Sequence, residues 1–285
     1  MNSDKKRSVL ITGASTGIGE ACALHLASRG WRVFAGVRRD EDGAALIAKG
    51  QDSIVPVLLD VTKPEQIKAA VETIRNTVGE TGLYGLLNNA GIAVGGPLEY
   101  LPTEQIEYQF RVNVFGAIAV TQACIPLIRK TQGRILFTSS NSGFWCEPFL
   151  SIYGGSKHAL EGIGDSLRFE LRPWGIHVAL IEPGMVSTPI WEKAKADSER
   201  ADTIYPTEAF ELYAAPIAVM RKIVNEKPAI VASPYRVAYA VQHALEARHP
   251  KTRYQVGIDS RIQYYLRRIM TDRMRDWLAR KIMGL

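Results

Sequence analysis

The sequence predicts an α/β fold, a doubly wound parallel sheet with helices on both faces, in a single domain. Short apolar, β-branched segments alternate with longer amphipathic segments along the chain, which is typical of βαβ units with right-handed crossovers. The alternation continues without a change in composition that would mark a domain boundary. The chain has 285 residues, 46% of them apolar and 22% charged, as in a globular protein with a buried core. We therefore expect residues 1–285 to form one domain.

The expected elements follow one another in βα order. Strands are expected at 9–12, 32–37, 54–59, 83–87, 134–138 and 178–181, and helices at about 18–29, 41–49, 63–78, 103–129 (in two stretches) and 152–172. The loops that follow five of these strands should open on one edge of the sheet, near the switch in strand order, where ligands bind in such folds. These loops begin at Gly13, Asp60, Asn88, Ser140 and Pro183.

The first loop carries three glycines between an apolar strand and an amphipathic helix, which is the context of a dinucleotide-binding loop. Gly13 permits a tight turn, Gly17 lets the backbone approach a pyrophosphate, and Gly19 lets the helix pack on the strand. Backbone N–H groups at the start of the helix favour phosphate oxygens. The spacing differs from the standard Gly-x-Gly-x-x-Gly, so an ordinary glycine-rich turn is the alternative interpretation.

Tyr153 and Lys157 are four positions apart, so on a helix they share one face. A free tyrosine has a pKa of about 10 and is a poor base at neutral pH. A nearby lysine cation favours the phenolate, and a phenol lowered by about two or three pKa units can exchange a proton with an alcohol or ketone. Ser140, at the end of another strand, is placed to hold the substrate oxygen. By itself the spacing also fits a helix face with an extended lysine.

Together these residues resemble the short-chain dehydrogenase/reductase family, whose fold is Rossmann-like. The resemblance extends from about Val9 to about Val256, and its motifs occur in the family's order. They are the loop Thr12–Gly19, the segment Asn88–Gly91, Asn113 within Val112–Val114, the trio Ser140, Tyr153 and Lys157, and Pro183–Gly184 with Thr188.

The resemblance implies a role for each matched residue. Ser140 is expected to orient the substrate oxygen and Tyr153 to exchange its proton. Lys157 is expected to lower the pKa of Tyr153 and bind the nicotinamide ribose, and Asn113 to complete the proton relay. Contacts with the cofactor are expected from Gly13, Ser15, Thr16, Gly17, Ile18, Gly19, Arg38, Arg39, Asp60, Val61, Asn89, Ala90, Gly91, Tyr153, Lys157, Pro183, Gly184, Val186 and Thr188. No metal site is expected.

The residues after the second strand favour NADP(H) over NAD(H). A ribose 2′-hydroxyl is usually accepted by an acidic residue at this place, and a 2′-phosphate by arginine. Here Arg38 and Arg39 come first, with no carboxylate until Asp40. A guanidinium pairs with phosphate through two parallel hydrogen bonds, although solvated loop charges would also explain both arginines. Asp60 and Val61 resemble the family's adenine-contacting pair, and a helix N-cap is the alternative interpretation of Asp60.

The loop between Ser140 and Tyr153 contains three aromatic residues, which favour an apolar substrate pocket. Packing under the loop or at a subunit contact is the alternative. Residues 187–233 are expected to form a substrate lid, and residues 258–285 a basic helical extension. The extension is expected to cover the pocket, join a subunit interface or rest weakly on a membrane surface.

Within the family, the chain is most similar to hydroxysteroid- and retinol-dehydrogenase-like members. The segments that carry this similarity are Gly36–Arg39, Tyr153–Glu161, Glu182–Gly184 and Tyr254–Asp259. It implies an NADP(H)-dependent oxidoreductase acting on a lipophilic secondary alcohol or ketone. The alternatives are an NADP(H)-sensing binding protein without turnover and a reductase of a smaller carbonyl substrate.

Composition limits which partners and which cellular compartment we expect for the protein. The formal charge is +6, but no nucleic-acid motif accompanies it, so we expect no nucleic-acid partner. The charged N-terminus has no signal-peptide pattern, and no apolar run is expected to reach the ~20 residues that span a bilayer. Three widely spaced cysteines fit a reducing compartment. We expect a cytoplasmic homodimer or homotetramer.

Overall fold

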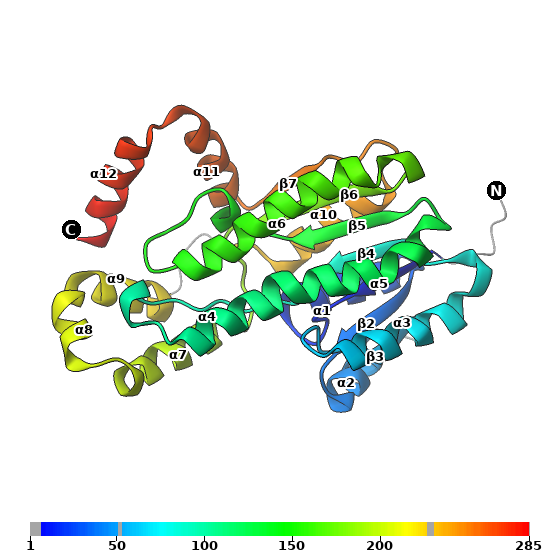
Figure 1. Ribbon diagram of the computed structural model, residues 1–285, viewed down its shortest axis with the longest axis horizontal. Helices are drawn as coiled ribbons and strands as arrows, with labels where there is room; N and C mark the ends of the chain where they lie inside the picture. The colour runs from blue at the N-terminus through cyan, green and yellow to red at the C-terminus, as the bar shows by residue number, and fades with distance from the viewer. Residues whose placement is uncertain (1–6, 51–52, 227–230, 285) are drawn as a thin grey trace.

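The computed structural model describes residues 7–50, 53–226 and 231–284 (Figure 1). The charged run 1–6, residues 227–230 of the expected lid and the last residue of the expected extension lie outside the described residues. Seven strands form one parallel sheet in the order β3-β2-β1-β4-β5-β6-β7. They are β1 Ser8–Ile11, β2 Arg32–Val37, β3 Ile54–Leu58, β4 Gly85–Asn88, β5 Arg134–Thr138, β6 His177–Pro183 and β7 Arg253–Val256.

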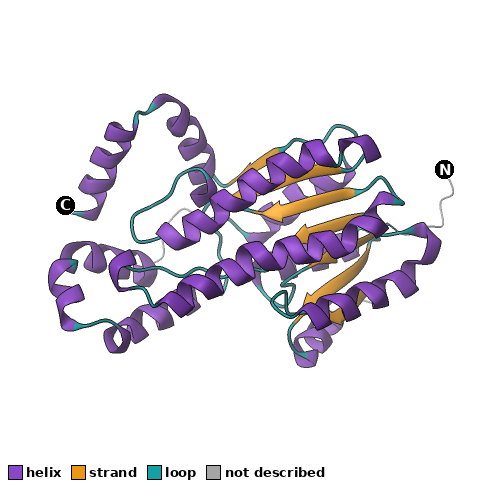
Figure 2. Cartoon of the chain, in the orientation of Figure 1, coloured by secondary structure: helices purple, strands orange, loops and turns teal. Residues whose placement is uncertain are grey.

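The chain winds outward from β1 in both directions, so strand order switches between β1 and β4. Helices cover both faces of the sheet (Figure 2). They are α1 Gly17–Ser28, α2 Asp40–Gly50, α3 Pro64–Val78, α4 Thr103–Phe110, α5 Ala117–Arg129, α6 Ser151–Glu170 and α10 Pro234–Glu246. The expected doubly wound parallel sheet is confirmed, and its switch point marks the edge where a ligand is expected.

The two apolar cores follow from the alternation of side chains along each strand. Val9 and Ile11 belong to the core that includes residues of α1 and α10, whereas Leu10 belongs to the core that includes α3 and α5. All three strand residues are fully buried. A strand that is buried on both faces explains why the sequence reads as a continuous apolar run.

Between α4 and α5 the chain forms a π-helical turn, Arg111–Gly116, which sequence patterns did not predict. The whole stretch Thr103–Arg129 is long and apolar enough to cross a membrane by length and composition alone, contrary to the expectation from the sequence. In the fold it packs against α3 and β4, and 56% of its most apolar window is buried. This is the burial of a core helix on a parallel sheet.

Two helical groups lie beyond the carboxyl ends of the strands (Figure 1). The expected lid contains α7 Ile190–Ile204, α8 Thr207–Leu212 and α9 Ala214–Glu226, and the expected extension contains α11 Ile258–Ile269 and α12 Asp272–Met283. Helix α12 packs against α9, and Met283 at its end is buried. The insertion and the C-terminal helices therefore contact each other at the edge of the sheet where the site is expected.

Candidate active site

The loops after β1 and β4 are held together by hydrogen bonds. The Thr12 hydroxyl accepts hydrogen bonds from the N–H groups of Asn89 and Ala90, at 2.9 and 3.0 Å. The Asn89 side chain donates to the carbonyls of Thr12 and Gly13, both at 3.1 Å. A Cβ on Gly13, whose φ is +64°, would lie 2.8 Å from the Ala90 Cα. Gly13 is thus required both by its backbone conformation and by this close approach.

The rest of the glycine loop fits a pyrophosphate. Thr16 has the extended N-cap conformation for α1, but its side chain makes no capping hydrogen bond, so it leaves the first-turn N–H groups to other acceptors. Gly17, with φ +62°, lies against the Thr188 side chain, and a Cβ there would be 3.1 Å from the Thr188 Cβ. A Cβ on Gly19 would be 2.6 Å from the Asn89 side-chain nitrogen. Ser15 and Ile18, in the same turn, are half-buried.

The segment after β6 is placed next to this loop by contacts with the C-terminal half of the chain. Pro183 ends β6, and the N–H of Gly184 donates to the Val256 carbonyl at 2.9 Å. Val186 is buried and forms an isolated parallel bridge with Ala232. These contacts bring the predicted residues after β1, β4 and β6 to one edge of the sheet.

The two arginines after β2 are exposed but differ in their partners. Arg39 forms a two-point ion pair with Asp42, at 2.7 and 3.1 Å. Among the described residues, Arg38 has no carboxylate within ion-pair distance. Arg38 is therefore the guanidinium better placed to donate hydrogen bonds to a 2′-phosphate.

Asp60 shapes its own loop. Its carboxylate accepts hydrogen bonds from the N–H and the hydroxyl of Thr62, at 2.9 and 2.7 Å. Burial raises the pKa of Asp60, but the bonds from Thr62 and the charge of Arg38 outweigh it and leave the pKa below its usual value. The N-cap position of α3 belongs to Lys63, so the N-cap interpretation of Asp60 was wrong. Val61 is buried next to this turn.

Ser140, Tyr153 and Lys157 come together where β5 meets α6. The Lys157 Nζ lies 5.7 Å from the centre of the Tyr153 ring and donates a hydrogen bond to the Thr138 carbonyl at 2.8 Å. A Cβ on Gly91, in the loop after β4, would lie 3.7 Å from the same Nζ. The Ser140 hydroxyl is within hydrogen-bonding reach of the Tyr153 phenol and also donates to the Asn141 side chain at 2.9 Å.

Burial dominates the electrostatics of this pair. It lowers the pKa of Lys157 to about 8, against the opposing charge of Glu161. It also raises the pKa of Tyr153, although the hydrogen bond with Ser140 opposes this and the charge of Glu147 adds to it. The expected lowering of the Tyr153 pKa by lysine is therefore not present in this structure. The physical reason is that desolvation of the phenolate outweighs a cation whose hydrogen bond goes to Thr138.

Asn113 lies in the π-helical turn and is 1% exposed. Its carboxamide accepts from the N–H of Ile92 at 2.9 Å and donates to the Ile92 carbonyl at 3.0 Å and to the Ser156 hydroxyl at 3.1 Å. The side chain therefore fixes the loop after β4 against α6. Short π-helical segments occur often at functional sites, and Asn113 is 3.4 Å from the position that a Gly91 Cβ would take.

A polar network beside Ser140 was missed by sequence reasoning. The Glu147 carboxylate accepts from the Ser142 hydroxyl at 3.0 Å and from Gln263 at 3.4 Å. Asn141, the partner of Ser140, donates to Gln263 at 2.6 Å. Burial raises the pKa of Glu147. Gln263 lies 122 positions from Asn141, so no local pattern reveals this network.

The aromatic residues of the same loop pack against the insertion and the C-terminal helices. Phe144 meets Tyr264 of α11 with ring centres 5.7 Å apart, and Phe149 meets Tyr213, just after α8, at 5.8 Å. The Phe149 carbonyl accepts from the Gly96 N–H at 2.8 Å. These contacts agree with the alternative in which the rings pack beneath neighbouring segments.

Known proteins are similar to this chain along most of their length. A family model described as short chain dehydrogenase matches residues 7–199. An NADPH-dependent 3-dehydrocapnine reductase from Ornithobacterium rhinotracheale is 35% identical over 275 residues, which are 95% of each chain. Retinol dehydrogenase 16 from Mus musculus is 34% identical over 292 residues, covering 96% of this chain and 89% of the relative.

A solved structure supports the same assignment. The crystal structure of a short-chain dehydrogenase from Streptomyces avermitilis aligns with a TM-score of 0.77 at 26% identity, over 94% of both chains. Family model, relatives and fold agree with one another. The chain therefore belongs to the short-chain dehydrogenases and is an NAD(P)-dependent oxidoreductase.

Proposed function

We propose that the protein is an NADP(H)-dependent oxidoreductase that interconverts a lipophilic secondary alcohol and its ketone. The observation that carries the proposal is the buried Lys157 ammonium, which lies 5.7 Å from the centre of the Tyr153 ring and 3.7 Å from where a Gly91 Cβ would be, in the loop after β4. This placement supports a role for the Tyr153 phenol in proton exchange, because it brings the phenol to the edge of the sheet where ligands bind in such folds. Similarity to an NADPH-dependent reductase and to retinol dehydrogenases supports the cofactor and the substrate class.

A nicotinamide cofactor supplies the hydride in such chemistry, and the protein contributes orientation and electrostatics. In the reducing direction, the Ser140 hydroxyl donates a hydrogen bond to the carbonyl oxygen of the substrate. The Tyr153 phenol gives that oxygen its proton as the carbonyl carbon is reduced. A raised pKa keeps Tyr153 protonated at neutral pH, which suits a general acid. The Lys157 cation stabilises the phenolate that remains.

The glycine loop and Arg38 are the residues that would hold the cofactor. The first-turn N–H groups of α1 favour the pyrophosphate. A Cβ on Gly13 or Gly17 would come too close to the neighbouring loops, so both positions need glycine. Arg38 would pair with the 2′-phosphate, because Arg39 is already held by Asp42. Asp60 and Val61 would border the adenine.

The insertion and the C-terminal helices favour a lipophilic substrate. Their aromatic residues, Tyr213 and Tyr264, pack against Phe149 and Phe144 of the loop that follows Ser140, so the surroundings of this loop are apolar and aromatic. We propose that residues 187–233 act as a lid and that residues 258–285 cover the same region.

A panel of ketones tests the proposal. Purified protein is mixed with NADPH and ketones that share one reacting group but carry progressively longer apolar chains, and NADPH consumption is followed. We expect kcat/KM to rise with chain length, because each methylene buried is worth about 0.8 kcal/mol. Equal rates for short and long ketones would favour the smaller-carbonyl alternative. Tight NADPH binding without turnover of any ketone would favour a sensor.

A further inference from the structure

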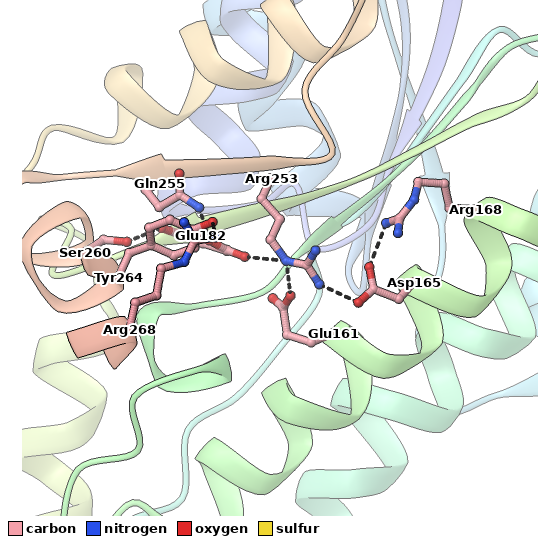
Figure 3. Close-up of polar contacts among 9 residues, drawn as sticks. All are labelled: Glu161, Asp165, Arg168, Glu182, Arg253, Gln255, Ser260, Tyr264 and Arg268. Atoms are coloured by element: carbon pink, nitrogen blue, oxygen red, sulfur yellow. Dashed lines mark hydrogen bonds and ion pairs between the residues drawn. The ribbon is translucent and has the colours of Figure 1, made fainter. Parts of the chain in front are cut away.

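Three carboxylates surround one guanidinium between α6, β6 and β7 (Figure 3). Arg253 of β7 donates to Glu161 at 2.9 Å and to Asp165 at 2.7 Å, both on α6. Its Nε also lies 3.2 Å from the carboxylate of Glu182 on β6. The three carboxylates differ in burial, since the Asp165 side chain is 41% exposed while those of Glu161 and Glu182 are 12% and 1% exposed.

The buried part of this cluster has more negative than positive groups. Asp165 is compensated at the surface by a second partner, Arg168, at 2.6 Å. In direct contact Glu161 and Glu182 share the single charge of Arg253, so if both were ionised one negative charge would remain beside it, opposed by the more distant charge of Lys157. An uncompensated buried charge costs several kcal/mol, so carboxylates in such pairs retain a proton instead.

The hydrogen bonding of Glu161 and Glu182 also indicates that one of the two carboxyl groups keeps its proton. Within the described residues one buried oxygen of each group makes no hydrogen bond, although the Oε1 of Glu182 lies 3.2 Å from the Nε of Arg253 and Glu161 is within reach of the Ser139 hydroxyl. The two groups are within hydrogen-bonding reach of each other. Two carboxylates cannot donate to one another, but a carboxylic acid can donate to a carboxylate. A single proton between them would therefore let the two carboxyl groups bond to each other, which two ionised carboxylates cannot do.

The pair lies one helical turn beyond Lys157, because Glu161 follows the lysine by four positions on α6. The charge of Glu161 opposes the effect of burial on the pKa of Lys157. Burial, followed by the charge of Glu161, raises the pKa of Glu182 to about 8. The direction of both shifts means that the pair keeps a proton at neutral pH and that Lys157 gives up its own more easily than a free lysine does.

We propose that Glu161 and Glu182 share one proton at neutral pH, and that loss of this proton in alkaline solution keeps Lys157 charged. The proposal rests on the proposed function, since it concerns the lysine of that site. Both glutamates act as positioning residues, because their effect reaches the substrate only through Lys157. The other charged groups that face them are Arg253 of β7 and Asp165 of α6.

Two isosteric variants test the shared proton directly. In the wild type without ligands, the infrared band of a protonated carboxylic acid should be present at pH 7 and should disappear as the pH rises through about 8. Both Glu161→Gln and Glu182→Gln should lose this component of the band, because the remaining carboxylate has Arg253 to itself and ionises. Glu170→Gln, an exposed residue near the end of α6 that pairs with Ser166, is the matched control and should keep the band.

The pH dependence of kcat/KM tests the link to Lys157. With only one carboxylate left, the lysine should lose its proton earlier, so the alkaline limb should move to lower pH in Glu182→Gln, by on the order of 0.5–1 pH unit. A larger movement is expected for Glu161→Gln, which is the nearer residue. The alkaline limb of the kcat/KM profile of Glu170→Gln should lie at the same pH as that of the wild type.

The two readouts separate the failure of this proposal from that of the proposed function. A band that persists in both glutamine variants, or that is absent from the wild type, would overturn the shared proton, and no turnover is needed to see it. An unchanged alkaline limb in both variants would overturn the link to Lys157. If Glu161→Gln fails to fold, Glu182→Gln alone decides each point.

Discussion

The Lys157 ammonium faces the Tyr153 ring at 5.7 Å but gives its hydrogen bond to the Thr138 carbonyl. Both side chains belong to α6, and burial disfavours the charged form of each. The site therefore holds a cation that water would stabilise better and a phenol that keeps its proton. Such an arrangement suits proton donation to a ketone but costs folding free energy.

Replacing Lys157 by methionine should stabilise the fold at neutral pH. Burial lowers the pKa of Lys157 from 10.5 to about 8. The unfolded state therefore binds more protons between these values, so the penalty for the buried cation is full below pH 8 and fades as the pH rises toward 10.5. We expect Lys157→Met to gain about 1–3 kcal/mol in urea unfolding at pH 7. The gain should shrink at higher pH, and equal stability of both proteins at pH 7 would contradict it.

The two arginines after β2 should contribute unequally to cofactor choice. Arg39 is paired with Asp42, whereas Arg38 has no such partner within ion-pair distance in the described chain. Charge-assisted hydrogen bonds are worth about 1.5–3 kcal/mol, so Arg38→Ala should weaken NADPH binding about tenfold to a hundredfold or more and leave NADH binding nearly unchanged. Arg39→Ala should have a smaller effect. Fluorescence titration with both cofactors measures this.

High salt provides the control for that experiment. Interactions of exposed charges are screened, so the loss in Arg38→Ala should be smaller at high ionic strength. An unchanged NADPH/NADH ratio in the Arg38 variant would show that this guanidinium is only a solvated loop charge. A wild type that prefers NADH would overturn the cofactor assignment.

Two glycine substitutions separate a required glycine from a dispensable one. Gly13→Ala places a Cβ 2.8 Å from the Ala90 Cα at a φ of +64°, so it should disturb the loop and reduce cofactor affinity strongly. Gly162, in the middle of α6, has nothing within 4 Å of an added Cβ. Gly162→Ala should leave cofactor binding unchanged and raise stability by about 0.5–1 kcal/mol. Normal cofactor affinity in Gly13→Ala would contradict the role of that turn.

The sequence predicted the sheet and the loops well because parallel strands in this fold are buried on both faces. Runs such as Val9–Ile11 are apolar throughout, and each is followed by a loop at the same edge. The glycine loop, Asn89 and Lys157 therefore lie at the same edge of the sheet, as expected. Strand β7 was recognised only as a segment of family resemblance, because its four residues are mixed in character.

Predictions from the sequence failed where the surroundings of a residue, and not its type, decide its pKa or its contacts. The spacing of Tyr153 and Lys157 indicated proximity, but not that burial would raise the pKa of the phenol. The cap that was the alternative interpretation of Asp60 is absent, because its carboxylate bonds to Thr62 in its own turn. Glu182 and Arg253 are 71 positions apart in sequence, and no local pattern reports that they share a buried cluster.

The Tyr153→Phe variant tests the central claim, that Tyr153 exchanges the substrate proton, most directly. NADPH consumption is measured with the best ketone of the panel, and NADPH affinity is measured alongside to show that the site is intact. We predict an unchanged affinity and a kcat about 10²–10⁴-fold lower, as for a lost general acid. A variant that binds NADPH normally and keeps kcat within about threefold of the wild type would contradict this account, because such a change lies far below that expected range.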